Sequence, residues 1–198
     1  MERMTRIVLS GLLVALLGAC AIDRPRPVSP ESVSAAMVAL PEQWHAVGRV
    51  AVKQASEGWS AGFDWQQRAT RADIQVRGPL GIGAVVIVLT PSHLRIESGQ
   101  RPLLELDAPF DAMDSVLQQR LGVAVPLPML RYWMLGVPDP SAPSVERAGG
   151  FEQLEWQVTP TERAAVVGLA GALPTRLDIR HGDTRVRWVI DRWQVGVP

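Results

Sequence analysis

The sequence predicts a mainly β fold with a few short helices, in which antiparallel strands form a sheet or a barrel. Three observations lead to this prediction. Apolar and polar residues alternate with a period of two over several segments, turn-forming residues recur about every ten positions, and helical spacing is confined to short segments near the start and in the middle. Apolar residues make up 47% of the chain, which is ample for a hydrophobic core.

Residues 1–19 have the form of a bacterial signal peptide. Arg3 and Arg6 make the start basic, and an uncharged run of apolar and small residues follows them. This run is shorter than the roughly 20 residues that a membrane-spanning helix needs. It ends at Leu17-Gly18-Ala19-Cys20, which resembles a lipobox. We therefore expect cleavage before Cys20 and modification of Cys20 with S-diacylglycerol and N-acyl groups.

An ordinary signal peptide that happens to precede a cysteine is the alternative. Cys20 is the only cysteine of the chain, so it cannot form an internal disulfide, and lipidation explains it better. The next residue is Ala21 rather than the aspartate of the usual inner-membrane retention signal. This favours a lipid anchor in the cell outer membrane, with the protein on its periplasmic face.

The folded part is expected to begin after a proline-rich tether. Residues 20–30 form the lipidated N-terminus and tether, which three prolines keep extended. Pro30 also marks the start of a helix whose apolar residues continue to Leu40. Residues 31–198 have a length that suits a single domain.

Alternation then predicts a series of short strands separated by turns. The clearest case is 59–66, where Trp59, Ala61, Phe63 and Trp65 alternate with polar or small residues. The strands expected in the first half are 45–53, 59–66, 73–77, 84–89, 93–97 and 103–106. Those expected in the second half are 152–158, 164–169, 176–180 and 184–193.

The middle of the chain is expected to hold two short helices. Apolar residues repeat at helical spacing over 112–121, and again over 127–135. Pro128 suits the start of the second helix and Gly136 suits its end. Residues 138–150 are polar and rich in proline, so we expect a connection there.

The sequence contains no motif for enzymatic chemistry. His45, His93 and His181 are isolated, with no cysteine or carboxylate at metal-ligand spacing. Nucleophile-elbow, zinc-protease and phosphate-binding-loop patterns are absent. We therefore expect no catalytic residues, no cofactor and no metal. Without its signal peptide the chain has one more acidic than basic residue, so no nucleic-acid partner is expected.

Residues 77–83 join two strong strands through a turn that carries apolar side chains. Gly78 and Pro79 are usual turn residues, whereas Leu80 and Ile82 stand where a hairpin tip is normally polar. Leu80 could fold back onto the core, since single apolar residues in turns are common. In the other interpretation Pro79, Leu80 and Ile82 form an exposed hydrophobic tip that touches lipid.

The chain resembles the LolB family of outer-membrane lipoproteins. The matching residues follow the family's order across nearly the whole mature chain, and they are specific in combination with the lipobox rather than one by one. They are Gly62-Phe63-Asp64-Trp65-Gln66-Gln67, Gly78-Pro79-Leu80-Gly81, Pro126-Leu127-Pro128, Leu130, Trp133, Leu135, Gly136, Gln153, Trp156, Leu173-Pro174 and Trp193.

This resemblance implies a half-open antiparallel β-barrel with helices covering a hydrophobic cavity. It implies a monomeric receptor and chaperone that accepts client lipoproteins from a LolA-like periplasmic carrier, holds their acyl chains and inserts them into the outer membrane. The leucine of the family's protruding loop falls on Leu80. The candidate residues of the acyl-chain cavity are Trp65, Trp133, Trp156, Trp193, Phe63 and Met134.

One region departs from the family's pattern. Where the family often has an aromatic residue after the strand that begins at Trp156, this chain has Val158-Thr159-Pro160, and residues 168–172 are only glycine, alanine and leucine. Two other functions remain open. The protein could be an outer-membrane lipoprotein that binds another hydrophobic ligand or a protein partner, or a structural lipoprotein whose tryptophans fill the barrel.

Overall fold

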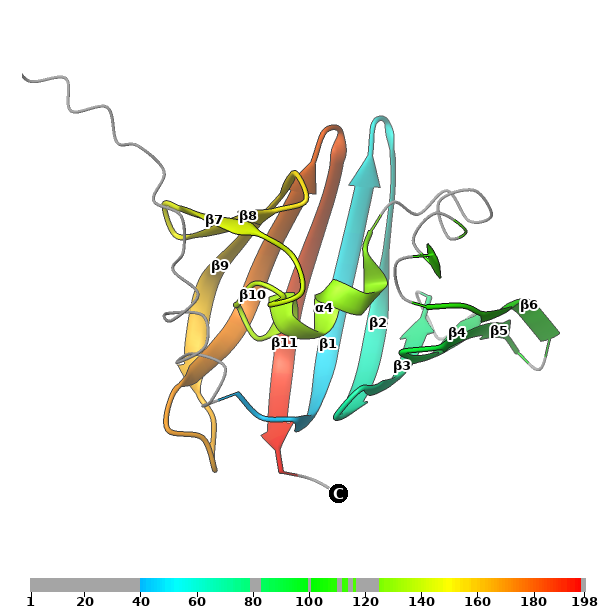
Figure 1. Ribbon diagram of the computed structural model, residues 1–198, viewed down its shortest axis with the longest axis horizontal. Helices are drawn as coiled ribbons and strands as arrows, with labels where there is room; N and C mark the ends of the chain where they lie inside the picture. The colour runs from blue at the N-terminus through cyan, green and yellow to red at the C-terminus, as the bar shows by residue number, and fades with distance from the viewer. Residues whose placement is uncertain are drawn as a thin grey trace, which may run out of the picture.

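A computed structural model of the chain describes residues 40–78, 83–99, 101–109, 112–113, 116 and 125–196. Within these ranges an 11-stranded antiparallel sheet curves around a helix that lies against its concave face (Figure 1). The mainly β fold is confirmed. The sheet is open rather than closed, as expected of a half-open barrel.

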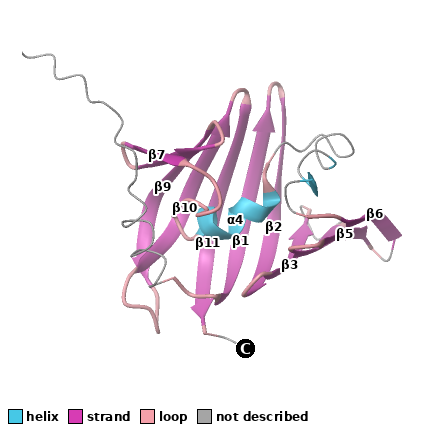
Figure 2. Cartoon of the chain, viewed as in Figure 1, coloured by secondary structure: helices cyan, strands magenta, loops and turns pink. Residues whose placement is uncertain are grey.

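The sheet is formed by long central strands and shorter outer ones (Figure 2). In chain order the strands are β1 (Gln43–Gln54), β2 (Glu57–Arg68), β3 (Arg71–Arg77), β4 (Ala84–Thr90), β5 (His93–Ser98), β6 (Arg101–Asp107), β7 (Ser144–Arg147), β8 (Gly150–Gln153), β9 (Trp156–Ala165), β10 (Ala172–His181) and β11 (Thr184–Val195). The helix α4 (Leu127–Met134) lies between β6 and β7 in the chain.

The strand order is β6-β5-β4-β3-β2-β1-β11-β10-β9-β8-β7. Every neighbouring pair in this order is also consecutive in the chain, except β1 and β11, whose pairing joins two meanders into one sheet. Among the described strands β6 and β7 stand at the two ends and do not pair with each other. The sheet therefore curves around its core without closing.

The period of two along the strands sorts side chains onto two faces. On β2 the buried residues are Ala61, Phe63, Trp65 and Gln67, while the residues between them are more exposed. The concave face therefore carries the core. In the described strands the buried polar side chains are Gln67 and Gln153 alone, and all other buried side chains are apolar.

Helix α4 covers part of this concave face. Pro128 stands in its first turn and Arg131 in its last, both suited to those positions. Leu130, Trp133 and Met134 are buried against the sheet. Gly136 ends the segment with φ of 78°, a left-handed conformation that glycine adopts without strain. The predicted helix over 127–135 is thus confirmed.

The strands predicted in the first half are all confirmed, and so are those over 176–180 and 184–193. The signal peptide, the tether and the expected helix up to Leu40 lie outside the described residues, apart from Leu40 itself. Of the helix predicted over 112–121, residues 112, 113 and 116 are described and are helical. No helix in the described ranges is long and apolar enough to cross a bilayer.

Three expectations are wrong in the second half. The predicted connection 138–150 contains the short strand β7. The predicted strand 152–158 is two strands, because Leu154 and Glu155 adopt positive φ values of 48° and 64° and reverse the chain. The predicted strand 164–169 ends at Ala165, and residues 166–171 form the loop between β9 and β10.

Candidate functional site

The concave face of the central strands carries a cluster of aromatic rings. Trp44 of β1 lies 5.3 Å from Trp65 of β2 and 5.3 Å from Trp193 of β11, measured between ring centroids. Trp188 of β11 lies 4.8 Å from Phe63, edge to face, and 6.1 Å from Trp65. The structure thus brings Trp65, Trp193 and Phe63 together, as expected of residues that act in one site.

Trp44 and Trp188 connect this cluster, and sequence reasoning did not single them out. The period-two pattern indicated their burial, since Trp44 lies an even number of positions from the buried Ala46 and Val50 and so faces the same side of β1. Trp188 likewise alternates with exposed residues between Val186 and Ile190.

A second aromatic cluster lies under helix α4. The ring of Trp133 is 6.2 Å from that of Trp156 on β9 and 6.5 Å from that of Phe151 on β8. Trp156 stacks on His181 at 4.9 Å. Met134 is fully buried beside Trp133. The candidate cavity residues therefore fall into two groups, one on the central strands and one between α4 and the β8–β9 side.

Gln153 holds the second cluster in place. Its Oε1 accepts hydrogen bonds from Trp133 Nε1 at 2.8 Å and from the backbone N–H of Asp139 at 2.9 Å. Its Nε2 donates to the carbonyls of Asp139 at 2.7 Å and Ala142 at 2.8 Å. This fully satisfied amide fixes α4, the following loop and β8 relative to one another.

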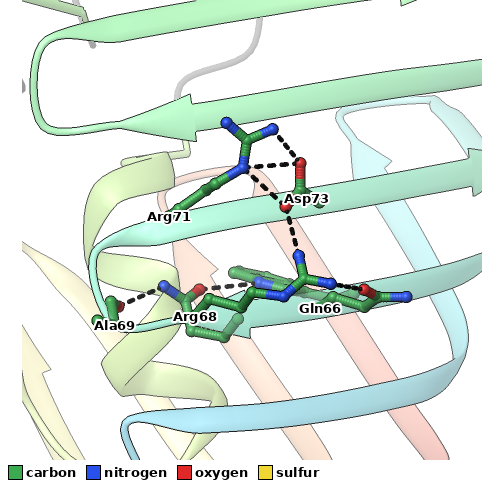
Figure 3. Close-up of polar contacts among 7 residues, drawn as sticks. Gln66, Arg68, Ala69, Arg71 and Asp73 are labelled. Atoms are coloured by element: carbon green, nitrogen blue, oxygen red, sulfur yellow. Dashed lines mark hydrogen bonds and ion pairs between the residues drawn. The ribbon is translucent and has the colours of Figure 1, made fainter. Parts of the chain in front are cut away.

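Gln67 plays a similar part near the β2–β3 turn. It accepts a hydrogen bond from Trp65 Nε1 at 3.0 Å and donates one to the carbonyl of Ala69 at 2.8 Å. On the other face Asp73 accepts hydrogen bonds from Arg68 and Arg71 (Figure 3). The hydrogen bond to Asp73 raises the pKa of Arg71, so this guanidinium stays charged.

Trp188 and Trp193, the two tryptophans of β11, differ in the hydrogen bonding of their indole N–H groups. Trp193 Nε1 donates to the carbonyl of Pro174 at 2.7 Å. Trp188 Nε1 is buried without a hydrogen-bond partner in the described part of the chain. An unpaired buried donor is uncommon, because desolvating it costs about 1–3 kcal/mol.

The tryptophan clusters are packed rather than open. Trp65 is 1% exposed, Trp133 is fully buried and Trp156 is 4% exposed. Trp193 is half-buried. Of the eight partly buried apolar residues on the described strands that pack against the core, five lie on the other side of the sheet, from β3 to β6: Val76, Val85, Ile87, Leu104 and Leu106.

A pocket of about 370 Å³ opens at the end of the first cluster. Trp44, Tyr132 and Leu135 give it apolar walls, and Gln67 and Arg131 add polar groups. Arg131 donates to the hydroxyl of Tyr132 at 2.7 Å and lies over its ring. In the described ranges no group of three or more metal-ligating side chains comes together.

The lipidation residue Cys20 and the loop residues Pro79, Leu80 and Ile82 lie outside the described residues. The hairpin that carries this loop is described: Arg77 of β3 pairs with Ala84 of β4, and the N–H of Gly78 donates to the carbonyl of Gly83 at 3.2 Å. The two ends of the loop are therefore held together.

Comparison with known proteins gives consistent results over nearly the whole chain. The sequence pattern of the family described as "Outer membrane lipoprotein LolB" matches residues 42–193. The chain is similar to the "Outer-membrane lipoprotein LolB" of Alkalilimnicola ehrlichii, with 32% identity over 208 residues that cover 98% of each chain. It is similar to the protein of the same name from Nitrosococcus oceani, with 30% identity over 206 residues and the same coverage.

A solved structure shares the fold at much lower sequence similarity. The crystal structure of a DUF1329 family protein from Desulfovibrio piger superposes with a TM-score of 0.51 over 85% of this chain and 92% of that chain. The two sequences are 5% identical, so this likeness concerns the fold alone.

Proposed function

The chain belongs to the LolB family of outer-membrane lipoproteins, and we propose from this that it accepts client lipoproteins from a LolA-like periplasmic carrier and inserts them into the outer membrane. In this proposal residues 1–19 are removed as a signal peptide and Cys20 carries the lipid anchor. The tether over residues 20–30 gives the single domain freedom to meet its partners on the periplasmic side.

The physical demand of this function is a place for acyl chains outside the bilayer. Leaving a methylene group in water costs about 0.8 kcal/mol, so three acyl chains together cost on the order of tens of kcal/mol. The observation that supports the proposal is the concave face, whose buried strand residues are apolar apart from two glutamines. Both glutamines are hydrogen-bonded within the protein, so neither weakens an apolar binding surface.

The packing of the tryptophans bears on where acyl chains bind. The half-buried face from β3 to β6 offers apolar area without rearrangement. Trp133 of α4 packs against Trp156 of β9 and both are buried, so acyl chains reach them only if α4 moves away from the sheet. We therefore propose that the first contacts form on the β3–β6 side, and that Phe63, Trp65, Trp133, Met134, Trp156 and Trp193 line the space that opens.

Brominated fatty acids test this binding surface, because bromine quenches tryptophan fluorescence at short range. We expect saturable quenching of the wild-type protein. An Ile87→Asp variant places a charge on the concave face of β4, and a Val88→Asp variant places one on the opposite face of the same strand. We expect Ile87→Asp to bind the fatty acid more weakly than Val88→Asp does. Equal quenching in the two variants contradicts the proposed surface.

The β3–β4 loop supplies the proposed contact with lipid. Leu80, flanked by Pro79 and Ile82, is the side chain that we expect to enter the outer membrane while the client is released. A Leu80→Glu variant is expected to receive lipoproteins but to insert them slowly. Leu103 on β6 is 51% exposed, so Leu103→Glu is a matched control that should insert normally. Normal insertion by Leu80→Glu rules out this role for Leu80.

The most direct test of the whole proposal is transfer of a radiolabelled lipoprotein from its periplasmic carrier to this protein and then to outer-membrane vesicles. The tight packing of tryptophans under α4 favours a second candidate function, that of a structural lipoprotein with a filled interior. This candidate predicts neither transfer nor quenching by brominated fatty acids.

A further inference from the structure

The loop between β9 and β10 carries an exposed apolar surface that the proposed function does not use. Residues 164–172, called the apolar tip below, consist of alanine, valine, glycine and leucine and have no polar side chain. Val167 is 97% exposed, the most exposed of the large apolar side chains in the described ranges. Turns in water normally carry glycine with polar residues such as asparagine, aspartate and serine, so this composition needs an explanation.

The apolar tip has a defined shape rather than an accidental one. The N–H of Leu169 donates to the carbonyl of Val166 at 3.1 Å, and Gly168 has φ of 86°. This tight turn packs Val166 and Leu169 partly against the core while Val167 points into solvent. At the base of the tip, Ala172 pairs with Ala165 across the two strands.

Arginines surround the base of the apolar tip. Arg163 donates to the carbonyl of Ala172 at 3.3 Å, and Arg176 lies 3.2 Å from Glu162. Arg192 is exposed and forms no ion pair in the described part of the chain. It lines a hollow of about 430 Å³ between the tip and β11, together with Trp193. Guanidinium groups bind phosphates well, and tryptophan favours the boundary between water and lipid.

The apolar tip lies at the end of the sheet where the described chain begins. The described chain begins at Leu40, and Trp44 pairs with Val195, whose side chain packs beside Gly168. The N–H of Gly196 donates to the carbonyl of Gln43 at 3.0 Å, so the start of β1 and the end of β11 meet here too (Figure 1). The described chain therefore begins at the same end of the domain as the tip.

We propose that the apolar tip inserts into the interfacial region of the outer membrane, with Val167 among the lipid chains and Arg192 against anionic headgroups. The bilayer is the occupant that these observations favour, because its apolar interior matches the exposed Val167 and its phosphate groups match the exposed Arg192. The proposal depends on the outer-membrane location of the family and not on transfer of clients. It gives the domain a lipid contact distinct from the β3–β4 loop, which leaves the sheet beyond Arg77, opposite Gly62 near the middle of β2.

Fluorescence at a single introduced thiol tests this contact. Because Cys20 is the only native cysteine, its lipidation leaves a Val167→Cys chain with one thiol that can take an environment-sensitive fluorophore. The full lipidated chain is placed in vesicles of phosphatidylethanolamine and phosphatidylglycerol, with or without brominated acyl chains. The matched control is Leu154→Cys, which replaces another exposed apolar residue, 51% exposed, at the opposite end of β9.

We expect the label at position 167 to shift to shorter wavelength in vesicles and to lose fluorescence to brominated lipid, and the label at position 154 to do neither. Adding Arg192→Glu should reduce the shift in vesicles that contain phosphatidylglycerol. A label at position 167 that stays in water overturns the proposal. So does a shift that appears without vesicles and grows with protein concentration, because the tip would then be a contact between two copies of this chain.

Discussion

Buried tryptophans differ at the level of single atoms, and these differences have measurable consequences. Trp65, Trp133 and Trp193 each donate the indole N–H to a protein oxygen, whereas Trp188 Nε1 is buried with no partner in the described ranges. The four indole rings have similar apolar area, so they differ in whether the indole N–H has a hydrogen-bond acceptor. Stability should depend on that donor when the ring is replaced by one that lacks it.

Replacing Trp133 and Trp188 separately by phenylalanine compares a paired donor with an unpaired one. Both changes remove the same atoms from the core. Trp133→Phe also removes the hydrogen bond to Gln153, so we expect it to lower the free energy of unfolding by about 1–2 kcal/mol more than Trp188→Phe does. Urea denaturation measures the difference. Equal losses would mean that Trp188 Nε1 is bonded to water or ligand in solution.

Asp178 makes a single-residue contribution to stability that depends on pH. Burial raises the pKa of its carboxyl, but hydrogen bonds and charge attraction from Arg185 and Arg187 outweigh burial and hold the pKa below the ordinary value of 3.8. A carboxyl whose pKa is lower in the folded state stabilises the fold above its unfolded pKa, and this contribution is lost as pH falls through the folded pKa.

Asp178→Asn is therefore expected to destabilise the protein at pH 7, and to do so less at a pH below 3.8, relative to wild type at each pH. Urea unfolding at both values measures this. Asp191→Asn is the control, because Asp191 pairs with Arg49 where both side chains are more than half exposed, and it should matter little at either pH. If the difference in unfolding free energy between Asp178→Asn and wild type is the same at both pH values, the role given to Asp178 is contradicted.

At the scale of elements, the sequence predicted structure well where local pattern and tertiary packing agree. Alternation over β2 and helical spacing over α4 both place their apolar residues on the core, so both predictions were confirmed. The reversal at Leu154 and Glu155 could not be predicted, because it uses non-glycine residues in a left-handed conformation. The strand predicted over 164–169 was wrong beyond Ala165, because apolar, β-branched residues indicate burial, whereas most of that segment is exposed.

The candidate site shows the same division. The resemblance identified Trp65, Trp133, Trp156 and Trp193, but not that their packing divides them between two clusters. The role of Gln153 in joining α4 to β8 depends on residues distant in the chain, and no local pattern predicts such a contact.

The end of α4 offers a test of backbone geometry. An added Cβ at Gly136, where φ is 78°, would lie 2.6 Å from Arg163 Nη2 and 2.9 Å from Pro174 Cγ. Gly182 also has positive φ, 52°, but nothing lies within 4 Å of an added Cβ. We expect Gly182→Ala to cost about 1 kcal/mol for backbone strain alone, and Gly136→Ala to cost about 1–2 kcal/mol more. Chemical denaturation of both variants separates strain from the steric clash; equal costs would contradict a clash at Gly136.

At the scale of the whole molecule, the open sheet has two unpaired edges among its described strands. β7 is only four residues long, and β6 carries Pro102 and outward charges such as Glu105. Short length, proline and charge are the usual protections of an edge strand against pairing with another chain. We therefore predict that the protein is a monomer despite its open sheet.

Glu105→Val tests this protection, because it places a second apolar side chain beside the exposed Leu103 on the long edge. We expect self-association that increases with concentration, measured by sedimentation velocity. Glu146→Val on the four-residue β7 edge should remain monomeric, since so short a strand gives little pairing. If both variants stay monomeric, something other than charge protects β6.

The pairing of β1 with β11 has a consequence for how the protein is made. Every other pair of neighbouring strands forms between segments that follow each other in the chain, so those contacts can form quickly and locally. The central pair joins the first strand, β1, to the last, β11. It can form only after the C-terminal strand has been synthesised and exported. Before the C-terminal strand arrives, the first meander (β1–β6) can be complete while the second lacks β11, so the two halves of the apolar face are not yet joined.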